Sequence, residues 1–215
     1  MARAIVHIVR HGETDENRQK IIQGQLDTVL NAAGLDQARR VAGALRANPF
    51  DVAFSSDLSR AVKTAETILA YHPTVQLQKI ADLRERHMGN LQGQAISPTA
   101  TASGNRSIET MALFASRAVR WWNKFLQYLS TLPVRDTPYE ILVVSHGGWI
   151  GALVRTLVNS RKLRTAEGVA IGKCLNVSVT RIEMDDNRNG TVTKYGNISH
   201  LVGKWVETNA DELYE

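Results

Sequence analysis

The sequence predicts an α/β protein whose mostly parallel sheet is covered by helices on both faces. Two observations lead to this fold class. Segments with strand-like hydrophobicity alternate along the chain with segments whose apolar residues recur at helical spacing. In addition, the strand-like segments 4–9 and 141–144 are apolar almost throughout, as is typical of strands that are buried on both faces.

The first predicted strand covers 4–9 and leads into a polar segment, 10–29. Asn31 is a favourable N-cap for a helix over 32–47, because its side chain can accept a hydrogen bond from the first turn. Asn48-Pro49 ends that helix, since proline cannot continue it. The chain therefore begins with a strand–helix unit.

A second unit of the same kind follows. A short strand is predicted around 52–54, and Asp57 is expected to cap the next helix. The apolar residues on one face of that helix are Ala61, Ala65, Ile68 and Leu69. Alternating hydrophobicity over 75–80 predicts a further strand.

The middle of the chain combines a loop and a long helix. Residues 84–106 contain several glycines and a Ser/Thr/Ala-rich patch, so they are predicted to form a loop with little core-forming power. A long helix is predicted over 107–130. Because Trp121 and Trp122 are adjacent, we expect only one to face the core and the other to be available for a subunit contact.

The last third repeats the strand–helix pattern. The strand at 141–144 is followed by a helix over 149–158. Alternation over 174–183 predicts another strand, followed by a turn at 187–190. The basic stretch 161–164 is expected to be a solvated loop.

Composition limits the classes of protein to consider. The chain has 215 residues, 43% hydrophobic and 22% charged, which are ordinary values for a globular protein. No linker divides it, so a single domain covering 1–215 is predicted. No apolar stretch approaches the roughly 20 residues of a membrane helix, and no signal peptide is visible, so we expect a cytoplasmic protein with no membrane partner. The single cysteine, Cys174, is expected to be a small core residue.

The net charge of +5 has two interpretations. It could favour an acidic small molecule, or it could reflect an uneven distribution of surface charge. The chain contains no basic repeat and no interleaving of basic and aromatic residues. A nucleic-acid partner is therefore not predicted.

Two polar motifs directly follow the two apolar strands. Arg10-His11-Gly12-Glu13 comes after 4–9, and Ser145-His146-Gly147-Gly148 comes after 141–144. In parallel α/β sheets, ligands bind beyond the carboxyl ends of the strands. We therefore expect His11 and His146 to converge in one cleft.

The residue types suit phosphoryl transfer without a metal ion. Arg10 offers a planar fork of donors to phosphate oxygens, His11 can act as a nucleophile or general base, and Gly12 would let the backbone approach a ligand. Arg60, in the first turn of a helix, can point toward the strand ends, and Glu85 could protonate a leaving alkoxide. Taken alone, Arg60 and Glu85 would more often be surface residues.

With further motifs, these residues resemble the phosphoglycerate-mutase-like branch of the histidine phosphatase superfamily. The match runs in order along nearly the whole chain, and five motifs in order are highly specific. The matching segments are Arg10-His11-Gly12-Glu13-Thr14 with Asn17, Gly24-Gln25-Leu26-Asp27 with Leu30 and Gly34, Ser55 to Ala61 with Thr64 to Thr67, Leu83-Arg84-Glu85 with Gly89 to Gly93, and Val144 to Gly148.

The resemblance implies a three-layer α/β/α sandwich that needs no metal and no cofactor. It implies that His11 is the nucleophile and becomes a phosphohistidine. Glu85 would protonate the leaving group and then activate water. Either a backbone carbonyl or Glu13 could fix the tautomer of His11, and His146 could act as a neutral ring or as an imidazolium. The residues implied to contact the substrate are Arg10, Asn17, Gln23, Gly24, Arg60, His146 and Gly147.

The short loop before the long helix bears on the type of reaction. Mutases of the superfamily usually carry a long insertion that caps the substrate, whereas only about a dozen residues separate Gln94 from Ser107. A more open pocket would let water reach the phosphohistidine. We therefore predict a phosphatase that acts on phosphomonoesters of small metabolites, of the sugar phosphate or bisphosphate class. A 2,3-bisphosphoglycerate-dependent phosphoglycerate mutase is the alternative.

Three further expectations accompany this prediction. Arg106 stands where many members have a glutamate before the long helix, so it either favours a more anionic substrate or is an exposed loop residue. A second alternative function is a non-catalytic member that binds phosphate or acts as a scaffold. Loss of catalysis usually removes the nucleophile, a phosphate-binding arginine or the acid, and all of these are present here. A homodimer is implied by the resemblance alone.

Overall fold

The computed structural model describes residues 3–95, 107–187 and 189–201. Its helices are α1 (Asp15–Gln19), α2 (Ala32–Leu45), α3 (Ser59–Leu69), α4 (Met111–Thr131) and α5 (Gly147–Asn159), with 3-10 turns η1 (Ala81–Leu83) and η2 (Gly89–Leu91). Its strands are β1 (Ala4–Arg10), β2 (Phe50–Ser55), β3 (Leu77–Lys79), β4 (Tyr139–Ser145), β5 (Leu163–Thr165), β6 (Val179–Met184) and β7 (Gly190–Asn197).

Within the described residues, the seven strands form one sheet in the order β3-β2-β4-β1-β6-β7-β5. The central strands β1 and β4 are parallel, as are β2 with β4, β2 with β3, and β5 with β7. Only β6 runs antiparallel to its described neighbours, β1 and β7. The predicted α/β class with a mostly parallel sheet is confirmed, whereas the extent of the domain, 1–215, stays a prediction.

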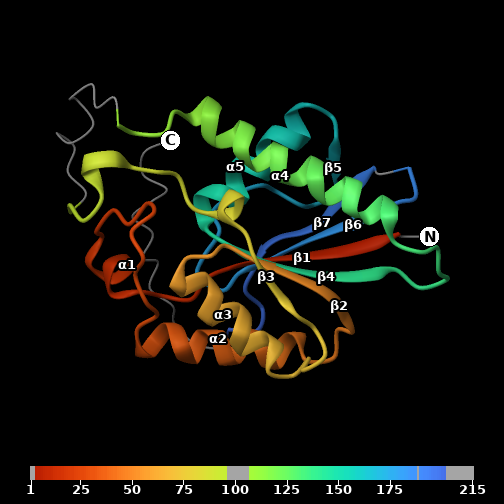
Figure 1. Cartoon of the computed structure of the whole chain (residues 1–215), viewed down its shortest axis with the longest axis horizontal. Coiled ribbons are helices and arrows are strands. Elements are labelled where there is room, and N and C mark those ends of the chain that lie inside the picture. The colour runs from red at the N-terminus through yellow and green to blue at the C-terminus, as the bar shows by residue number, and fades with distance from the viewer. Residues whose placement is uncertain (1–2, 96–106, 188, 202–215) are drawn as a thin grey trace.

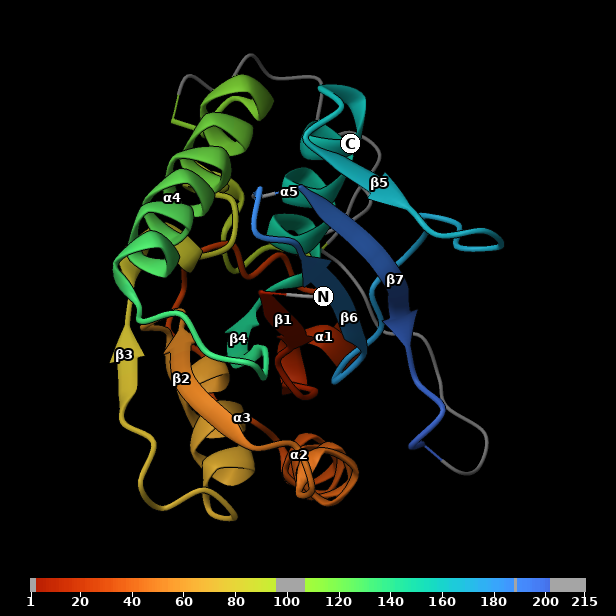
Figure 2. The same cartoon turned by 90° about the vertical axis from the view of Figure 1, so that its right-hand side faces the viewer.

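Helices cover both faces of the sheet. In Figure 1, α2 and α3 lie below the sheet and α4 and α5 lie above it. Figure 2 shows the same arrangement turned by 90° about the vertical axis. Alternate residues of β1 point into the two layers, since Ile8 packs in the core with α4 and α5, whereas Val9 packs in the core with α2 and α3. This burial on both faces explains why the central strands are apolar almost throughout.

The cap predicted for α3 was wrong. Leu58 is the N-cap of this helix and makes no side-chain cap bond, whereas the carboxylate of Asp27 accepts a hydrogen bond from Ser59 N–H in the first turn, at 2.6 Å. Asp57 instead accepts two hydrogen bonds from Arg84, at 2.7 and 2.6 Å. The pKa of Asp57 lies below its usual value, chiefly because of these hydrogen bonds. The aspartate therefore anchors the segment that carries Glu85 rather than the helix.

The start predicted for α4, at 107, was also wrong. The helix begins at Met111, because the side chain of Thr110 accepts a hydrogen bond from Leu113 N–H and so caps it. The glutamate directly before this cap is Glu109. Arg106, which stands where many members of the superfamily have a glutamate before the long helix, lies outside the described residues.

Both tryptophans of α4 are buried, so the prediction that only one faces the core was wrong. Trp121 is 4% exposed and Trp122 is 1% exposed. The ring of Trp121 packs edge-on against Phe54 of the sheet and Trp149 of α5. Because the sheet and α5 cover α4 together, its buried stripe is wide enough for adjacent residues. The subunit contact expected from one exposed tryptophan therefore loses its basis.

Three elements were missed by the sequence patterns. They are α1 within the polar segment 10–29, β5 within the basic stretch, and β7 after the predicted turn. In β5, Leu163 is buried against its neighbours, while the basic residues beside it are exposed as expected. A strand of three residues leaves too few positions for a period to show.

The strand predicted over 174–183 begins later than expected. β6 starts at Val179 rather than at 174, because Val177 has a left-handed backbone with φ of 53°. Its N–H donates to the carbonyl of Arg10, at 3.1 Å, instead of joining the sheet in register. Cys174 is buried as expected.

Among the helices of the described residues, none is both long enough and apolar enough to cross a membrane. The cytoplasmic location stays a prediction.

Candidate active site

The two predicted histidines meet at the carboxyl edge of the central strands. Arg10 is paired with Ser145 at the ends of β1 and β4, and His11 N–H donates to the carbonyl of Ser145 at 3.0 Å. His11 and His146 therefore leave neighbouring strands at the same level. Their ring centroids are 5.1 Å apart. The structure brings them together as the topology of a parallel sheet requires.

The ring of His11 is held in one tautomer. Its Nδ1 lies 2.7 Å from the carbonyl oxygen of Gly12, and a carbonyl can only accept, so Nδ1 carries the proton. Burial, followed by the charges of Arg60 and Arg10, holds the pKa of His11 well below its usual value. The ring is therefore neutral at pH 7, with its lone pair on Nε2. Of the two tautomer-fixing groups considered, the backbone carbonyl is the one in contact.

Two buried guanidinium groups adjoin the histidines. Arg10 is 1% exposed and donates to the carbonyl of Cys174 at 2.7 Å. Arg60 is fully buried and donates to the carbonyls of Leu26 and Gly24, at 2.7 and 2.8 Å. These carbonyl partners orient both guanidiniums and carry no net charge. The cations thus contribute a strongly positive field to the site.

His146 is the N-cap residue of α5, and its Nε2 lies 2.9 Å from the hydroxyl of Ser56. Burial and the neighbouring Arg60 hold its pKa well below the usual value, with smaller effects from His11, Arg10 and Arg117. The ring is therefore neutral in the absence of an anion. Its Nδ1 is buried and has no hydrogen-bond partner within the described residues.

Glu85 reaches the same edge from an irregular segment after η1. One carboxylate oxygen accepts a hydrogen bond from Gly148 N–H at 3.0 Å, and the other accepts from Arg86 N–H at 2.8 Å. A Cβ atom on Gly148 would lie only 2.6 Å from this carboxylate. Glycine at this position therefore lets Glu85 rest on the first turn of α5, two residues after His146.

The predicted substrate-contact residues divide into two groups. Asn17 is fully buried in α1, and its Nδ2 has no partner within the described residues, whereas its Oδ1 accepts from Thr14. Gly147 is buried and begins α5 next to His146. In contrast, Gln23 accepts hydrogen bonds from two threonine hydroxyls, and Gly24 orients Arg60 through its carbonyl. The substrate contacts predicted for these four residues stay predictions.

Gly12 also permits a close approach within the chain, while its expected approach to a ligand stays a prediction. A Cβ atom on Gly12 would lie 2.5 Å from the carbonyl oxygen of Gly34, and a Cβ on Gly34 would lie 2.0 Å from that of Glu13. The two glycines thus let the backbones of the 11–14 turn and α2 pack together. Within the protein itself, the close approach at Gly12 is to its own chain.

Sequence reasoning missed several residues that orient the site. Asn176 donates to the carbonyl of His11 at 3.0 Å, and the hydroxyl of Thr64 accepts from Gly12 N–H at 3.1 Å. Ser56 contacts His146. Thr64 and Ser56 stand inside recognised motifs, which was the available signal. Asn176 lies in none of them, and its role follows from the left-handed residue Val177 beside it.

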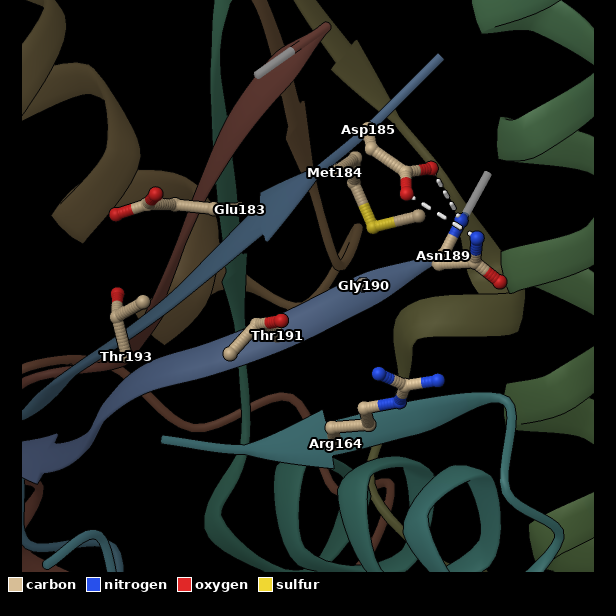
Figure 3. A pocket seen from close by; sticks show the side chains of 8 residues that line it. All are labelled: Arg164, Glu183, Met184, Asp185, Asn189, Gly190, Thr191 and Thr193. Atoms are coloured by element: carbon tan, nitrogen blue, oxygen red, sulfur yellow. Dashed lines mark hydrogen bonds between the residues drawn. The ribbon is translucent and has the colours of Figure 1, made fainter. Parts of the chain in front are cut away.

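A separate hollow of about 360 Å³ lies on the outer strands (Figure 3). It includes Arg164 of β5 and Met184 of β6. Met184 pairs with Ala4, at the opposite end of β1 from Arg10. Asp185 in this hollow accepts hydrogen bonds from Asn189 across a turn. The hollow is therefore distant from the histidines and is not part of their site.

Comparison with known proteins agrees with this geometry. The profile of the histidine phosphatase superfamily (branch 1) matches residues 6–197. The chain belongs to this superfamily. The predicted family and fold class are thereby confirmed, as is the prediction of an enzyme of the phosphatase type.

Members of the superfamily with different names resemble the chain to a similar degree. It is 34% identical over 208 residues to phosphoglycerate mutase-like protein 4 of Arabidopsis thaliana, which covers 92% of this chain and 87% of that protein. It is 30% identical over 210 residues to a metal-independent phosphoserine phosphatase of the same plant, covering 90% and 82%. The crystal structure of a phosphoglycerate mutase from Bacillus anthracis is 25% identical, with a TM-score of 0.75 and coverage of 92% and 94%.

Proposed function

We propose that this superfamily member is a metal-independent phosphatase that hydrolyses phosphomonoesters of small metabolites through a phosphohistidine at His11. One observation carries the proposal. His11 is neutral, has its proton committed to the Gly12 carbonyl, and lies beside two buried guanidiniums. A phosphoryl acceptor needs an unprotonated nitrogen next to fixed positive charge, and this arrangement supplies both.

In the first half-reaction, Nε2 of His11 attacks phosphorus. The Nε2–P bond forms while the P–O bond to the leaving group breaks, and Glu85 gives its proton to the departing oxygen. Arg10 and Arg60 offset the charge on the phosphoryl oxygens. The buried nitrogens of Asn17 and His146 that have no partner within the described residues gain one when an anion binds.

In the second half-reaction, water attacks the phosphohistidine. Glu85, now a carboxylate, takes a proton from the water as the new O–P bond forms. The Nε2–P bond breaks, and its electron pair returns to His11. Inorganic phosphate leaves, and both His11 and Glu85 regain their starting protonation states.

The experiment that tests this proposal follows phosphate release in EDTA from a panel of small phosphate esters. The panel contains sugar phosphates, sugar bisphosphates, phosphoserine and 3-phosphoglycerate. The wild type is expected to hydrolyse one or more of them and to trap radiolabelled phosphate as an acid-labile, alkali-stable adduct. His11→Asn is expected to do neither, while His72→Asn serves as a control for loss of a histidine. Equal activity of wild type and His11→Asn would contradict the mechanism.

The names of the relatives keep a mutase as the second candidate, because a phosphoglycerate mutase-like protein and a phosphoglycerate mutase are both among them. The small number of residues between Gln94 and Ser107 in the sequence supports hydrolysis. Interconversion of phosphoglycerates with 2,3-bisphosphoglycerate present is measured in parallel with phosphate release. Mutase turnover far above hydrolysis would replace the phosphatase proposal with the mutase.

A further inference from the structure

The segment that carries Glu85 depends on distant side chains for its shape. After η1 ends at Leu83, the backbone is irregular, and buried carbonyls in such a segment need partners from elsewhere. Four successive carbonyls, 82 to 85, each accept a hydrogen bond from a side chain outside the segment. The position of the proposed acid is therefore set by residues that are far from it in sequence.

Arg117 of α4 donates to three of the four carbonyls, and Trp149 and Gln25 also donate to the first and the last of them, at 2.9 and 3.0 Å. The guanidinium of Arg117 donates to the carbonyl oxygens of Asp82, Arg84 and Glu85, at 3.0, 2.7 and 3.0 Å. Ser145 donates to the remaining carbonyl, that of residue 83, at 2.8 Å. One planar fork thus spans the backbone directly around Glu85, a contact that a single ammonium group cannot reproduce.

Glu109 fixes Arg117 in turn. The two groups form a bidentate pair with both distances at 2.9 Å, and their side chains are only 12% and 15% exposed. Although burial acts to raise the pKa of Glu109, hydrogen bonds from Arg117 and from His87 N–H hold it below its usual value. Glu109 also accepts from Arg86 through its backbone carbonyl, at 2.7 Å. The Arg117–Glu109 pair therefore bonds to the residues on both sides of Glu85, Arg84 and Arg86.

We propose that Arg117, locked by Glu109, is a positioning residue that holds the carboxyl group of Glu85 where it can protonate the leaving group. This inference rests on the proposed phosphatase function. Glu85 reaches its backbone donors, Gly148 and Arg86, only if its own backbone stays in place. Because general acid catalysis is sensitive to small displacements, loosening this segment impairs proton donation before it impairs phosphate binding.

The test uses leaving groups that differ in their need for an acid. p-Nitrophenolate departs without protonation, whereas the alkoxide from glycerol 2-phosphate does not. Arg117→Met removes the fork and keeps an apolar stem over Phe114. Because kcat/KM reports the step in which the leaving group departs, it is measured for both esters. We expect about a 100-fold loss with the glycerol ester and less than about a fivefold loss with the nitrophenyl ester.

Arg120→Met is the matched control. Arg120 lies one turn further along α4, is more exposed, and contacts only the carboxylate of Asp82 in this segment, at 3.3 Å. Its substitution removes the same charge and is expected to change both kcat/KM values less than about twofold. Arg117→Lys, which keeps the charge but loses the fork, is expected to resemble Arg117→Met.

Several outcomes would overturn the inference. An equal loss with both esters, or no loss, would show that Arg117 does not act through the acid, and full rescue by lysine would show that only its charge matters. If circular dichroism shows that Arg117→Met does not fold, Glu109→Gln takes its place, with about a tenfold selective loss expected. If the wild type hydrolyses neither these two esters nor any ester of the metabolite panel, the proposed function fails and this inference fails with it. A wild type that hydrolyses both esters, together with a loss in the variants that is confined to the glycerol ester, supports the proposed function and this inference.

Discussion

Two histidines, one within β1 and one just after it, show how neighbours, rather than burial, decide what a side chain can do. His7 lies within β1 and His11 follows its end, and both are nearly inaccessible, at 4% and 1% exposed. The ring of His7 lies 2.7 Å from the carboxylate of Glu140, whereas the ring of His11 faces a carbonyl and two guanidiniums. His7 therefore has a carboxylate of the protein as its partner, whereas His11 lies beside a carbonyl and two positively charged groups.

The difference follows from the position of each residue along the sheet. Glu140 is the second residue of β4 and lies diagonally across from His7 in the register of the parallel pair. His7 lies within the sheet, where its ring contacts Glu140 of β4, Phe50 of β2 and Asn48. His11 lies past the last residue of β1, where loops and helix starts from several parts of the chain converge. The same residue type is thus part of the packing at one position and the proposed nucleophile at the other.

The largest expected effect separates the two histidines by activity. His11→Asn is expected to lower kcat more than about 1000-fold on any ester that the wild type hydrolyses, because no other group replaces the lost nucleophile. His7→Asn is expected to retain kcat within about threefold in its folded fraction. Steady-state phosphate release from both purified variants checks this. A comparable loss of kcat in the two variants would contradict the distinct role proposed for His11.

The second largest effect is on the free energy of unfolding, where His7→Asn is expected to be the more damaging of the two substitutions. His7→Asn leaves the buried carboxylate of Glu140 without its partner, so we expect about 3 kcal/mol less free energy of unfolding. His11→Asn removes a ring that loses only one hydrogen bond, and we expect a smaller change. Urea unfolding of both variants at pH 7.5 measures it. Equal stabilities would mean that the His7–Glu140 contact contributes little.

A smaller effect is expected where the carboxyl edge depends on a glycine. Gly148→Ala would place a Cβ atom 2.6 Å from the carboxylate of Glu85, which would have to move. We expect about a tenfold fall in kcat/KM for glycerol 2-phosphate and little change for p-nitrophenyl phosphate. Gly43→Ala, where a Cβ would meet nothing within 4 Å, is the control. If Gly148→Ala changes kcat/KM for neither ester, Glu85 is not the general acid.

The smallest effect concerns pH. Burial and the two guanidiniums lower the pKa of His11, so below about pH 6.5 the unfolded chain takes up a proton that the folded protein does not. The stability contributed by the neutral ring is thus complete above that pH and falls as the pH is lowered. Between pH 7.5 and 5.5, His11 should account for about 1 kcal/mol of lost stability.

Comparing wild type with His11→Asn isolates this contribution, because His146, His72 and His200 also have lowered pKa values, each with burial as the largest cause. The variant is expected to lose less stability than the wild type over the same pH interval in urea titrations. A steeper loss in the variant would show that His11 is protonated in the folded protein.

Much of the fold and of the site was predictable, and the failures have local causes. Strand β1 and helix α2 were predictable because their hydrophobic patterns are long. The start of β6 was not, because it depends on the left-handed Val177. The cap of α3 was misplaced because Asp57 has a better partner in Arg84, a residue that lies far along the chain. Asn176 could not be assigned, since it reaches His11 only through the fold.

The sequence by itself determined the alternation of strands and helices, the two apolar central strands, and the motifs that end them. Each of these is encoded by neighbouring residues, and parallel pairing then brings the ends of the strands together. Only the tertiary structure decided the tautomer and neutrality of His11, the partner of Asp57, and the grip of Glu109 and Arg117 on the segment of Glu85. Those depend on distances between residues that are remote in sequence, and on burial that no local pattern specifies.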